Sequence, residues 1–320
     1  MVSDAAGKNS GAKKGLEKRV PVDANGRVVA VARRRWGEVV LTVIIGCLLL
    51  ALAYSLMVNP NLHWNVVGEF FFAPAIMDGI KTTLLLTVFS QSIAVVLGIV
   101  IALMQQSYNQ TIALSAKAYI WFFRGTPLLV QLVFWFNLAL LFPTLGIGIP
   151  WKDFWWGIDT NRAISPFMAA LLGLGLHEAG YMAEIVRGGL YSVGKGQMEA
   201  ALSIGMTRGK AQQRIILPQI IRVIIPPTGN QLITMLKASS LVAVIGGGDL
   251  LTRTQSLYSQ NYEVMALLII ASFWYLFLVS IASIGQYYLE RSLAQDTPGY
   301  DPRPFWRRLG VNVLKPGRTV

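Results

Sequence analysis

The sequence predicts an all-α polytopic membrane protein with about six transmembrane helices. Apolar residues make up 54% of the 320 residues and charged residues only 14%, which leaves too few polar side chains to cover a water-soluble chain of this length. The apolar residues also gather in long runs that have the length a helix needs to cross a hydrocarbon core, roughly 20 residues. Finally, the basic residues gather in alternate connections between these runs.

Six apolar runs follow one another along the chain. We expect transmembrane helices at residues 39–58, 79–104, 119–142, 165–186, 227–248 and 264–289. The first run stays apolar as far as Val58, where a processed protein would already have turned polar. We therefore expect an uncleaved first helix, although residues 51–53 are similar to a signal-peptidase site and the run ending at Cys47 is loosely similar to a lipoprotein box.

Basic residues lie mainly on one side of the predicted spans. They are frequent before the first span, between the fourth and fifth spans and after the sixth, whereas the opposite connections hold only Lys152, Arg162 and Arg253. Because Lys and Arg are retained in cytoplasmic loops, both termini are predicted to be cytoplasmic. Residues 1–38, expected to be disordered, and 290–320 are then basic tails in the cytoplasm. This topology and anionic lipid headgroups account for the net charge of +12, so the charge does not indicate a nucleic-acid partner.

A polar stretch at residues 196–218, between the fourth and fifth spans, predicts two short helices outside the bilayer. Met198, Leu202 and Met206 recur every four residues and give the first helix one apolar stripe. Gly205 should break or bend this helix, and Thr207 is a suitable N-cap for a second one. The second helix should end before Pro218, because the residue before a proline is pushed out of the helical region. An ordinary interfacial loop explains the periodicity equally well.

The same stretch carries a spacing that resembles the EAA loop of bacterial ABC importer permeases. Glu199, Ala200 and Ala201 are followed by Gly205 and, at the end, by Pro218. Further segments are similar to the polar amino-acid permeases of the histidine and glutamine type: RGTPLLVQ at 124–131, AEIVRGG at 183–189, KGQ at 195–197 and KASSL at 237–241. Together the matches cover residues 79–289. The chain departs from the subfamily at Glu178, where a small or neutral residue is frequent, and at Ala238, where an acidic one is.

The resemblance implies a core of five membrane helices at residues 79–289, to which the helix at 39–58 is an addition. It implies a coupling loop at residues 191–218 that docks into a separate ATPase through Glu199, Ala200, Ala201, Gly205 and Pro218. The implied partners are two ATP-binding subunits, an extracytoplasmic solute-binding protein and a second permease subunit, identical or related. The implied location is the bacterial cytoplasmic (inner) membrane.

The chain has no complete ATP site of its own. A phosphate-binding loop needs G-x-x-x-x-G-K followed by Ser or Thr. Residues 189–195 fit the first part, but Gly196 stands where the hydroxyl is required. Two histidines and one cysteine also provide no metal-ligand cluster. We therefore expect no catalytic site and no cofactor on this chain, with ATP and Mg bound by the partner ATPase.

Two ionisable residues, Glu178 and Lys237, fall near the middle of predicted spans, where a charge costs roughly 2.5–3.5 kcal/mol. We expect them to approach one another or to line a translocation cavity. A structural ion pair and a contact with substrate are equally good interpretations. The other candidates for the substrate pathway are Gln131, Asn230, Gln231 and Thr234. The alternative role for these four residues is hydrogen bonding between helices.

Two further features concern packing and bending. Ser90, Ala94, Gly98 and Ala102 repeat every four residues on the second span and form a strip against which another helix can pack closely. The Pro226-Pro227 pair marks a break below the fifth span, which is either a hinge or a simple helix end.

The sequence thus predicts the permease subunit of an ATP-driven ABC importer for polar amino acids, in which a separate ATPase drives alternating access. An ion-coupled secondary transporter using Glu178, Glu184 or His177 is the alternative, although such folds contain inverted repeats and the sequence has no convincing one. A membrane scaffold without transport is the third possibility, and it requires that the charges within the spans be dispensable.

Overall fold

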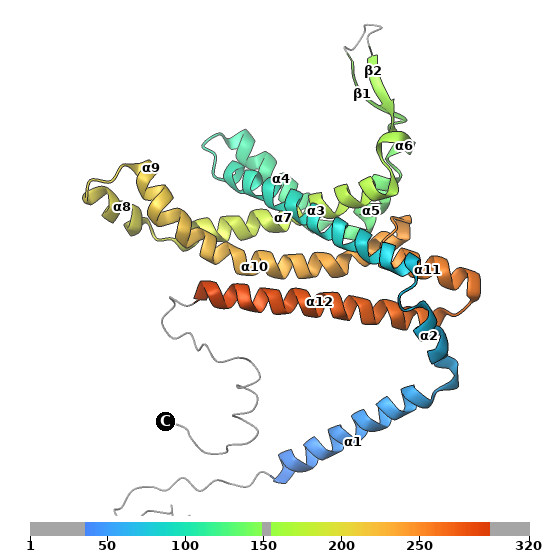
Figure 1. Ribbon diagram of the computed structural model, residues 1–320. Coiled ribbons are helices and arrows are strands. Elements are labelled where there is room, and N and C mark those ends of the chain that lie inside the picture. The colour runs from blue at the N-terminus through green and yellow to red at the C-terminus, as the bar shows by residue number, and fades with distance from the viewer. Residues whose placement is uncertain (1–35, 149–154, 295–320) are drawn as a thin grey trace, which may run out of the picture. The chain divides into compact units, whose positions relative to one another are not determined.

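The computed structural model describes residues 36–148 and 155–294, which are mostly helical. Most of the two predicted basic tails and Trp151 therefore lie outside the described residues. The helices are α1 Trp36–Val58, α2 Trp64–Phe70, α3 Pro74–Gln105, α4 Gln110–Gly125, α5 Leu128–Phe136, α6 Thr160–Ala163, α7 Pro166–Ser192, α8 Lys195–Ser203, α9 Arg208–Ala211, α10 Leu217–Ala238, α11 Leu250–Asn261 and α12 Val264–Ala294 (Figure 1).

Helix α1 is apolar on all sides. None of its 23 residues is buried, and the exposed side chains include Leu50 at 73% and Met57 at 71%. An amphipathic surface helix would show a polar face, so this composition is that of a helix surrounded by lipid. The helices from α2 to α12 belong to a separate compact unit that begins at Met57.

Three of the described helices, α1, α3 and α12, are long and apolar enough to cross a membrane on their own. Two bent pairs raise this number to five if each pair is one span: α4 with α5, and the segment Arg208–Ile245 with α11. The fourth predicted span corresponds to α7, which has 27 residues. Its glycines, His177 and Glu178 lower its mean hydropathy. Six spans are therefore consistent with the helices, but two of the six are broken.

The third predicted span, residues 119–142, is not one straight helix. Helix α4 ends at Gly125, and α5 begins after Pro127 at an angle of 100°. The cause is Pro127, because a proline pushes the preceding Thr126 into an extended conformation, with ψ of 140°. Gln131 spans the bend, since its amide donates to the carbonyl oxygens of Phe123 and Thr126 at 3.0 and 3.2 Å.

The fifth predicted span begins much earlier than residue 227. The helix after Thr207 does not end before Pro218 but continues through a π-helical turn, Gln212–Ile216, into α10. Pro218 is tolerated there because it lies in the first turn of α10. Pro226 and Pro227 lie inside α10 and end no helix. Gln286 of α12 donates to the Pro226 carbonyl at 2.8 Å, which holds this part of α10 against α12.

Helix α10 ends in a 3₁₀ segment, Ser239–Ile245, and a glycine-rich turn precedes α11. Gly246 and Gly248 have positive φ angles of 67° and 80°, which favour glycine. Asp249 is fully buried and caps α11 by accepting the backbone N–H groups of Leu251 and Thr252 at 3.0 and 3.3 Å. This cap fixes the direction of α11 after the break.

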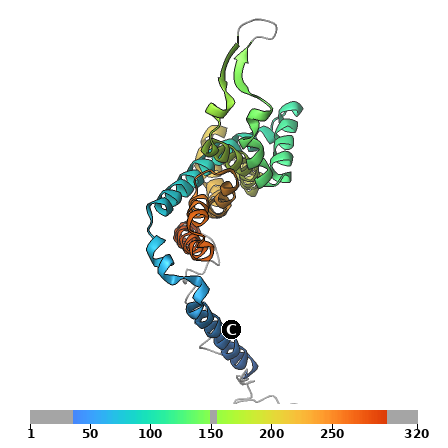
Figure 2. The same ribbon diagram turned by 90° about the vertical axis from the view of Figure 1, so that its right-hand side faces the viewer.

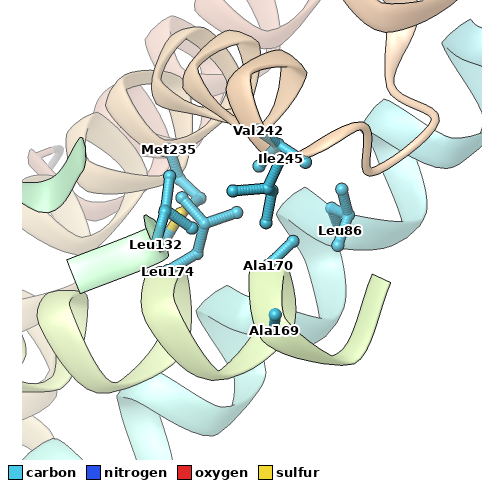
Figure 3. Packing of buried hydrophobic residues seen from close by; sticks show 8 residues of the cluster. All are labelled: Leu86, Leu132, Ala169, Ala170, Leu174, Met235, Val242 and Ile245. Atoms are coloured by element: carbon cyan, nitrogen blue, oxygen red, sulfur yellow. The ribbon is translucent and has the colours of Figure 1, made fainter. Parts of the chain in front are cut away.

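The main core surrounds α7, which packs against α3, α4, α5 and α10. One cluster of buried side chains joins α3, α5, α7, α10 and the 3₁₀ segment (Figure 3); it consists of Leu86, Leu132, Ala169, Ala170, Leu174, Met235, Val242 and Ile245. The predicted strip of small residues on α3 lies in this interior, since Ser90, Ala94, Gly98 and Ala102 are all buried. A Cβ atom on Gly98 would lie 2.5 Å from Cβ of Met182, so α3 and α7 approach closely at this glycine.

A β-hairpin that was not predicted lies between α5 and α7. Its strands are β1 Thr144–Gly148 and β2 Trp155–Asp159, and they pair antiparallel. The sequence predicted only a connection between the third and fourth spans here, at residues 143–164. Glycine is unfavourable in strands, and three of the ten strand residues are glycines, which weakened the strand signal.

Candidate functional site: the loop between α7 and α10 and the buried polar cluster

The loop between α7 and α10 forms the predicted helix, turn and helix. Helix α8 ends at Ser203, and Gly205 turns the chain with a φ angle of 84°. The N–H of Met206 donates to the carbonyl of Ala201 at 3.1 Å, and that of Gly205 donates to Leu202 at 3.0 Å. These bonds close the C-terminus of α8 in the way that a left-handed glycine typically does.

Helix α9 begins at the predicted cap, because the Thr207 hydroxyl accepts the N–H of Lys210 at 3.4 Å. Ala201 of α8 and Ala211 of α9 are buried, at 2% and 0% exposure. Their small side chains allow the two short helices to pack against each other and against the π-helical turn. The loop is therefore a folded unit rather than an irregular connection.

Four of the five residues predicted to contact an ATPase, namely Glu199, Ala200, Gly205 and Pro218, are exposed. The fifth, Ala201, is buried in the loop and acts in its packing. The sequence analysis missed Ile204, whose side chain is 77% exposed next to the Gly205 turn. An apolar residue directly before a turn-forming glycine in a polar loop was the available signal. Ile204 thus adds an exposed apolar side chain to the same loop as the exposed predicted contact residues.

The loop is joined to the membrane bundle through a tight contact between α7 and α10. A Cβ atom on Gly189 would lie only 2.4 Å from Cγ1 of Ile224 and 3.5 Å from Cγ2 of Ile220. The absence of a side chain at Gly189 thus lets the two helices touch directly below the loop. Helix α7 also carries Glu178, and α10 carries Gln231 and Lys237. The loop therefore connects the two helices that carry these polar residues (Figure 1).

Glu178 is 5% exposed on α7, and Gln231 of α10 is its hydrogen-bonding neighbour. Its Oε1 atom has no hydrogen-bond partner among the described residues. Burying a carboxylate without full compensation is costly. The burial is therefore compensated either by a proton on the carboxyl group or by a further group at this oxygen.

Gln131 lies on α5 and is 5% exposed. Its amide nitrogen contacts Nδ1 of His177 at 3.1 Å and the Thr126 hydroxyl at 2.6 Å. The His177 ring lies 5.3 Å from that of Tyr181, over which the Arg124 guanidinium is placed at 4.9 Å. These contacts make Gln131 and His177 structural links between α5 and α7, yet Oε1 of Gln131 has no partner among the described residues.

Two more buried polar atoms without a partner in the described part of the chain belong to α3. They are Oγ of Ser90 and Oε1 of Gln91, whose amide nitrogen lies 3.5 Å from the sulfur of Met182. The sequence analysis treated Ser90 only as a small packing residue and did not select Gln91. A lone glutamine in an apolar helix was the signal that could have identified it.

Lys237 does not pair with Glu178. Its side chain is exposed, and no ion pair joins these residues in the ranges 36–148 and 155–294. Asn230 and Thr234 are also exposed, and with Lys237 they follow the 3.6-residue period on one outer face of α10. The expected approach of Glu178 to Lys237 is thus wrong for a single chain, because Gln231 and Lys237 lie on different faces of the helix.

The structure also bears on the other predicted chemistry. Gly189 lies within α7 and Lys195 begins α8. The segment 189–195, which partly matches the phosphate-binding pattern, therefore lies in and after a helix and does not follow a strand. No group of three or more metal-ligating residues occurs where the structure is described. Glu184 is paired with Arg187 at 2.6 Å, so its carboxylate is already engaged.

Comparisons with known proteins agree with this architecture. Residues 94–295 match the family described as "Binding-protein-dependent transport system inner membrane component". The chain is 41% identical to the arginine transport system permease protein ArgU of Corynebacterium glutamicum, over 81% of this chain and 80% of that protein. It is 32% identical to the L-cystine transport system permease protein TcyB of Bacillus subtilis, over 75% of this chain and 94% of that protein.

Among solved structures, one chain of an amino acid ABC transporter crystallised with histidines resembles the present structure with a TM-score of 0.60. The identity is 35%, and the match covers 70% of this chain and 97% of that one. The family match, over residues 94–295, extends over more than half of the sequence. The chain therefore belongs to the family of inner membrane components of binding-protein-dependent transport systems, as a permease subunit of an ABC transporter.

Proposed function

We propose that this chain forms the membrane pathway of an ATP-driven importer of polar amino acids. The printed names of its relatives include an arginine and an L-cystine permease, and the similar structure belongs to an amino acid transporter. ATP and Mg are bound by two separate ATP-binding subunits on the cytoplasmic side. A solute-binding protein delivers the amino acid outside, and a second permease subunit completes the pathway in the cytoplasmic membrane, with both termini of this chain inside.

The observation that carries this proposal is the folded loop at Gly205, held between the two helices that carry Glu178 and Gln231. The exposed Glu199, Ala200 and Ile204 form the surface that an ATPase grips. Because Gly189 packs directly on Ile224, movement of this surface is passed to α7 and α10 together. The loop therefore couples nucleotide-driven motion to the polar residues in the spans.

The polar residues of the spans supply the contacts for the solute. The free Oε1 atom of Glu178 accepts a hydrogen bond from an ammonium or guanidinium group, which compensates its burial. Lys237, Asn230 and Thr234 lie on the exposed face of α10, which we place toward the second permease subunit. There, Lys237 contributes the positive charge that attracts a carboxylate. If these residues had only a structural role, replacing one of them would reduce assembly of the complex and would not change its affinity for the solute.

The proposal is tested by reconstituting the chain with its ATPase in proteoliposomes. We expect uptake of labelled arginine, glutamine, histidine or cystine to require ATP and Mg on the ATPase side and the binding protein on the other, while leucine is not carried. Replacement of ATP by a non-hydrolysable analogue is the control and should abolish uptake. Uptake that follows an ion gradient without nucleotide would contradict the proposal in favour of a secondary transporter, and no uptake under any condition would favour a scaffold.

A further inference from the structure

The hairpin of β1 and β2 has two chemically different faces. The backbone register pairs Leu145 with Ile158 and Ile147 with Trp156, whereas Gly146 pairs with Gly157 and Thr144 with Asp159. Because alternate residues of a strand point to opposite faces, Leu145, Trp156 and Ile158 share one face. The other face carries Thr144, Asp159 and glycines, and the register adds Trp155 at its far end, opposite Gly148. The face with Leu145, Trp156 and Ile158 is therefore the more apolar of the two.

The apolar face is uncovered in this chain. Trp156 is 74% exposed and Ile158 is 49% exposed. An isolated two-stranded hairpin is marginally stable in water and normally needs packing on one face. The two strands contact only the short helix α6 to any extent among the described elements. None of the described helices therefore covers this face.

The two ends of the hairpin are held together at its base. Thr160, the first residue of α6, is 1% exposed. Its hydroxyl donates to the carbonyl of Phe142, before β1, and its N–H donates to the Pro143 carbonyl at 3.0 Å. Asp159 caps α6 by accepting the N–H of Arg162 at 3.2 Å. Hydrogen bonds thus close the base of the hairpin where it leaves the helices.

The hairpin extends sideways at the end of the bundle opposite α8 and α9. In Figure 1 it runs crosswise to α7, α10 and α12, and in Figure 2 it again extends beyond the side of the bundle. Helices that cross a membrane stand along its normal, so a segment crosswise to them at their end runs along the membrane surface.

Exposed apolar side chains also lie just before the hairpin in the chain. Leu140, Leu141 and Phe142, which follow α5, are 81%, 62% and 55% exposed. Only Pro143 separates Phe142 from β1. The segment that leads from α5 into the hairpin is therefore also apolar and exposed.

We propose that the apolar face of the β1–β2 hairpin rests on the headgroup region of the outer membrane leaflet. Trp is enriched at this level of the bilayer. The two strands leave backbone N–H and C=O groups unpaired at both edges, and such groups are not tolerated in the hydrocarbon core. The hairpin therefore lies shallowly, with Trp156 and Ile158 toward the lipid and Thr144 toward water. This inference rests on the orientation stated under the proposed function.

Site-specific fluorescence quenching tests the proposal in the full chain reconstituted with its ATPase. In a Cys47→Ser background, Ile158→Cys and Thr144→Cys are each labelled with an environment-sensitive maleimide. We expect the label at 158 to be quenched several-fold more than that at 144 by lipids with a nitroxide near the headgroup, and little by lipids with a nitroxide deep in the chain. Aqueous iodide should show the reverse order.

Three results would overturn the proposal. One is equal iodide quenching of both labels, which places the whole hairpin in water. Another is shielding of position 158 from iodide without nitroxide quenching, which means that a binding protein or a second copy covers the face. The third is strongest quenching by the deep nitroxide.

Labelling of Thr144→Cys in spheroplasts by a membrane-impermeant maleimide checks the orientation separately. Labelling only after the membrane is opened would contradict the proposed orientation and this inference together. Labelling from outside, combined with equal iodide quenching, would contradict this inference alone and leave the proposed function intact.

Discussion

Gly189 of α7 and Ile224 of α10 are in such close contact that a Cβ atom at the glycine would lie 2.4 Å from Cγ1 of the isoleucine. This contact lies directly below the α8–α9 loop. Because of this contact, α7 and α10 are expected to move together near the loop. Any motion imposed on the loop then reaches both sides of the buried polar cluster around Glu178.

Gly189→Val should separate these helices and weaken coupling. Overpacking of a tight contact costs about 1–3 kcal/mol. We therefore expect the variant to insert into the membrane but to take up several-fold fewer amino acid molecules per ATP hydrolysed. The neighbouring Gly188 is exposed, with nothing within 4 Å of its Cβ position. Gly188→Val is therefore the matched control, and equal transport per ATP in both variants would argue against the contact as a coupling element.

Ile204→Ala should weaken the binding of the ATPase. The side chain is 77% exposed beside the Gly205 turn, and an apolar anchor at the centre of an interface contributes ~1–2 kcal/mol, or about 5- to 30-fold in affinity. The affinity of the purified permease for its ATPase can be measured in detergent by titration. Tyr108 is fully exposed in the connection between α3 and α4, on the side predicted to be cytoplasmic. Tyr108→Ala serves as the control, and an equal loss in both variants would mean that Ile204 has no special role.

Glu178→Gln should raise the KM for a cationic amino acid at least tenfold while the complex still assembles. The change keeps the size of the side chain and its contact with Gln231 but removes the charge at the free Oε1 atom. The loss should be smaller for a neutral amino acid such as glutamine. An equal loss of assembled complex and of uptake for both solutes would show that Glu178 acts only in packing.

Lys237→Met gives an independent test of the exposed face of α10. Because this side chain is exposed and unpaired with Glu178, its removal should leave the stability of the single chain unchanged. Uptake should fall if Lys237 faces the solute pathway. An intact complex with normal uptake would exclude a role in solute binding.

Gly98→Leu should destabilise the contact between α3 and α7. A Cβ atom at Gly98 would meet Cβ of Met182 at 2.5 Å and the backbone nitrogen of Ala183 at 3.0 Å, and backbone cannot move aside easily. We expect a loss of about 1–3 kcal/mol, seen as a lower midpoint in thermal unfolding in detergent. Gly285→Leu in α12, where nothing lies within 4 Å, is the control. An unchanged midpoint for Gly98→Leu would contradict the close approach.

The sequence predicted the spans that are apolar throughout more accurately than the broken ones. Residues 39–58 and 264–289 correspond to α1 and α12 because a uniform apolar run has only one low-energy solution in lipid. The run at 119–142 is equally apolar, but Pro127 divides it into α4 and α5. Pro226 and Pro227 have the opposite outcome, since packing of α10 on α12 through Gln286 keeps the helix continuous. Whether a proline interrupts a helix is thus decided by tertiary contacts, which a single sequence does not reveal.

The candidate site was predicted unevenly for a similar reason. Gly205 and Thr207 act locally, through a left-handed turn and an N-cap, so their roles follow from residue type and spacing. Glu178 and Lys237 were placed at similar depths from their positions along the helices, which says nothing about which face each occupies. Gln91 was missed because its burial depends on the packing of α3 against α7, which is distant in the sequence, whereas Ile204 had a local signal beside Gly205 that was not used.

The coupling role of the loop is tested most directly by the number of amino acid molecules taken up per ATP hydrolysed in proteoliposomes containing Gly205→Asp. This substitution places a charged side chain at a position with a φ angle of 84°, which aspartate adopts less readily than glycine, and so perturbs the turn between α8 and α9. Gly196→Asp adds the same charge to the exposed first turn of α8, where a carboxylate is favourable. We predict that hydrolysis continues but uptake per ATP collapses for Gly205→Asp and is normal for Gly196→Asp. A normal ratio for Gly205→Asp would contradict the assignment of this loop as the coupling element.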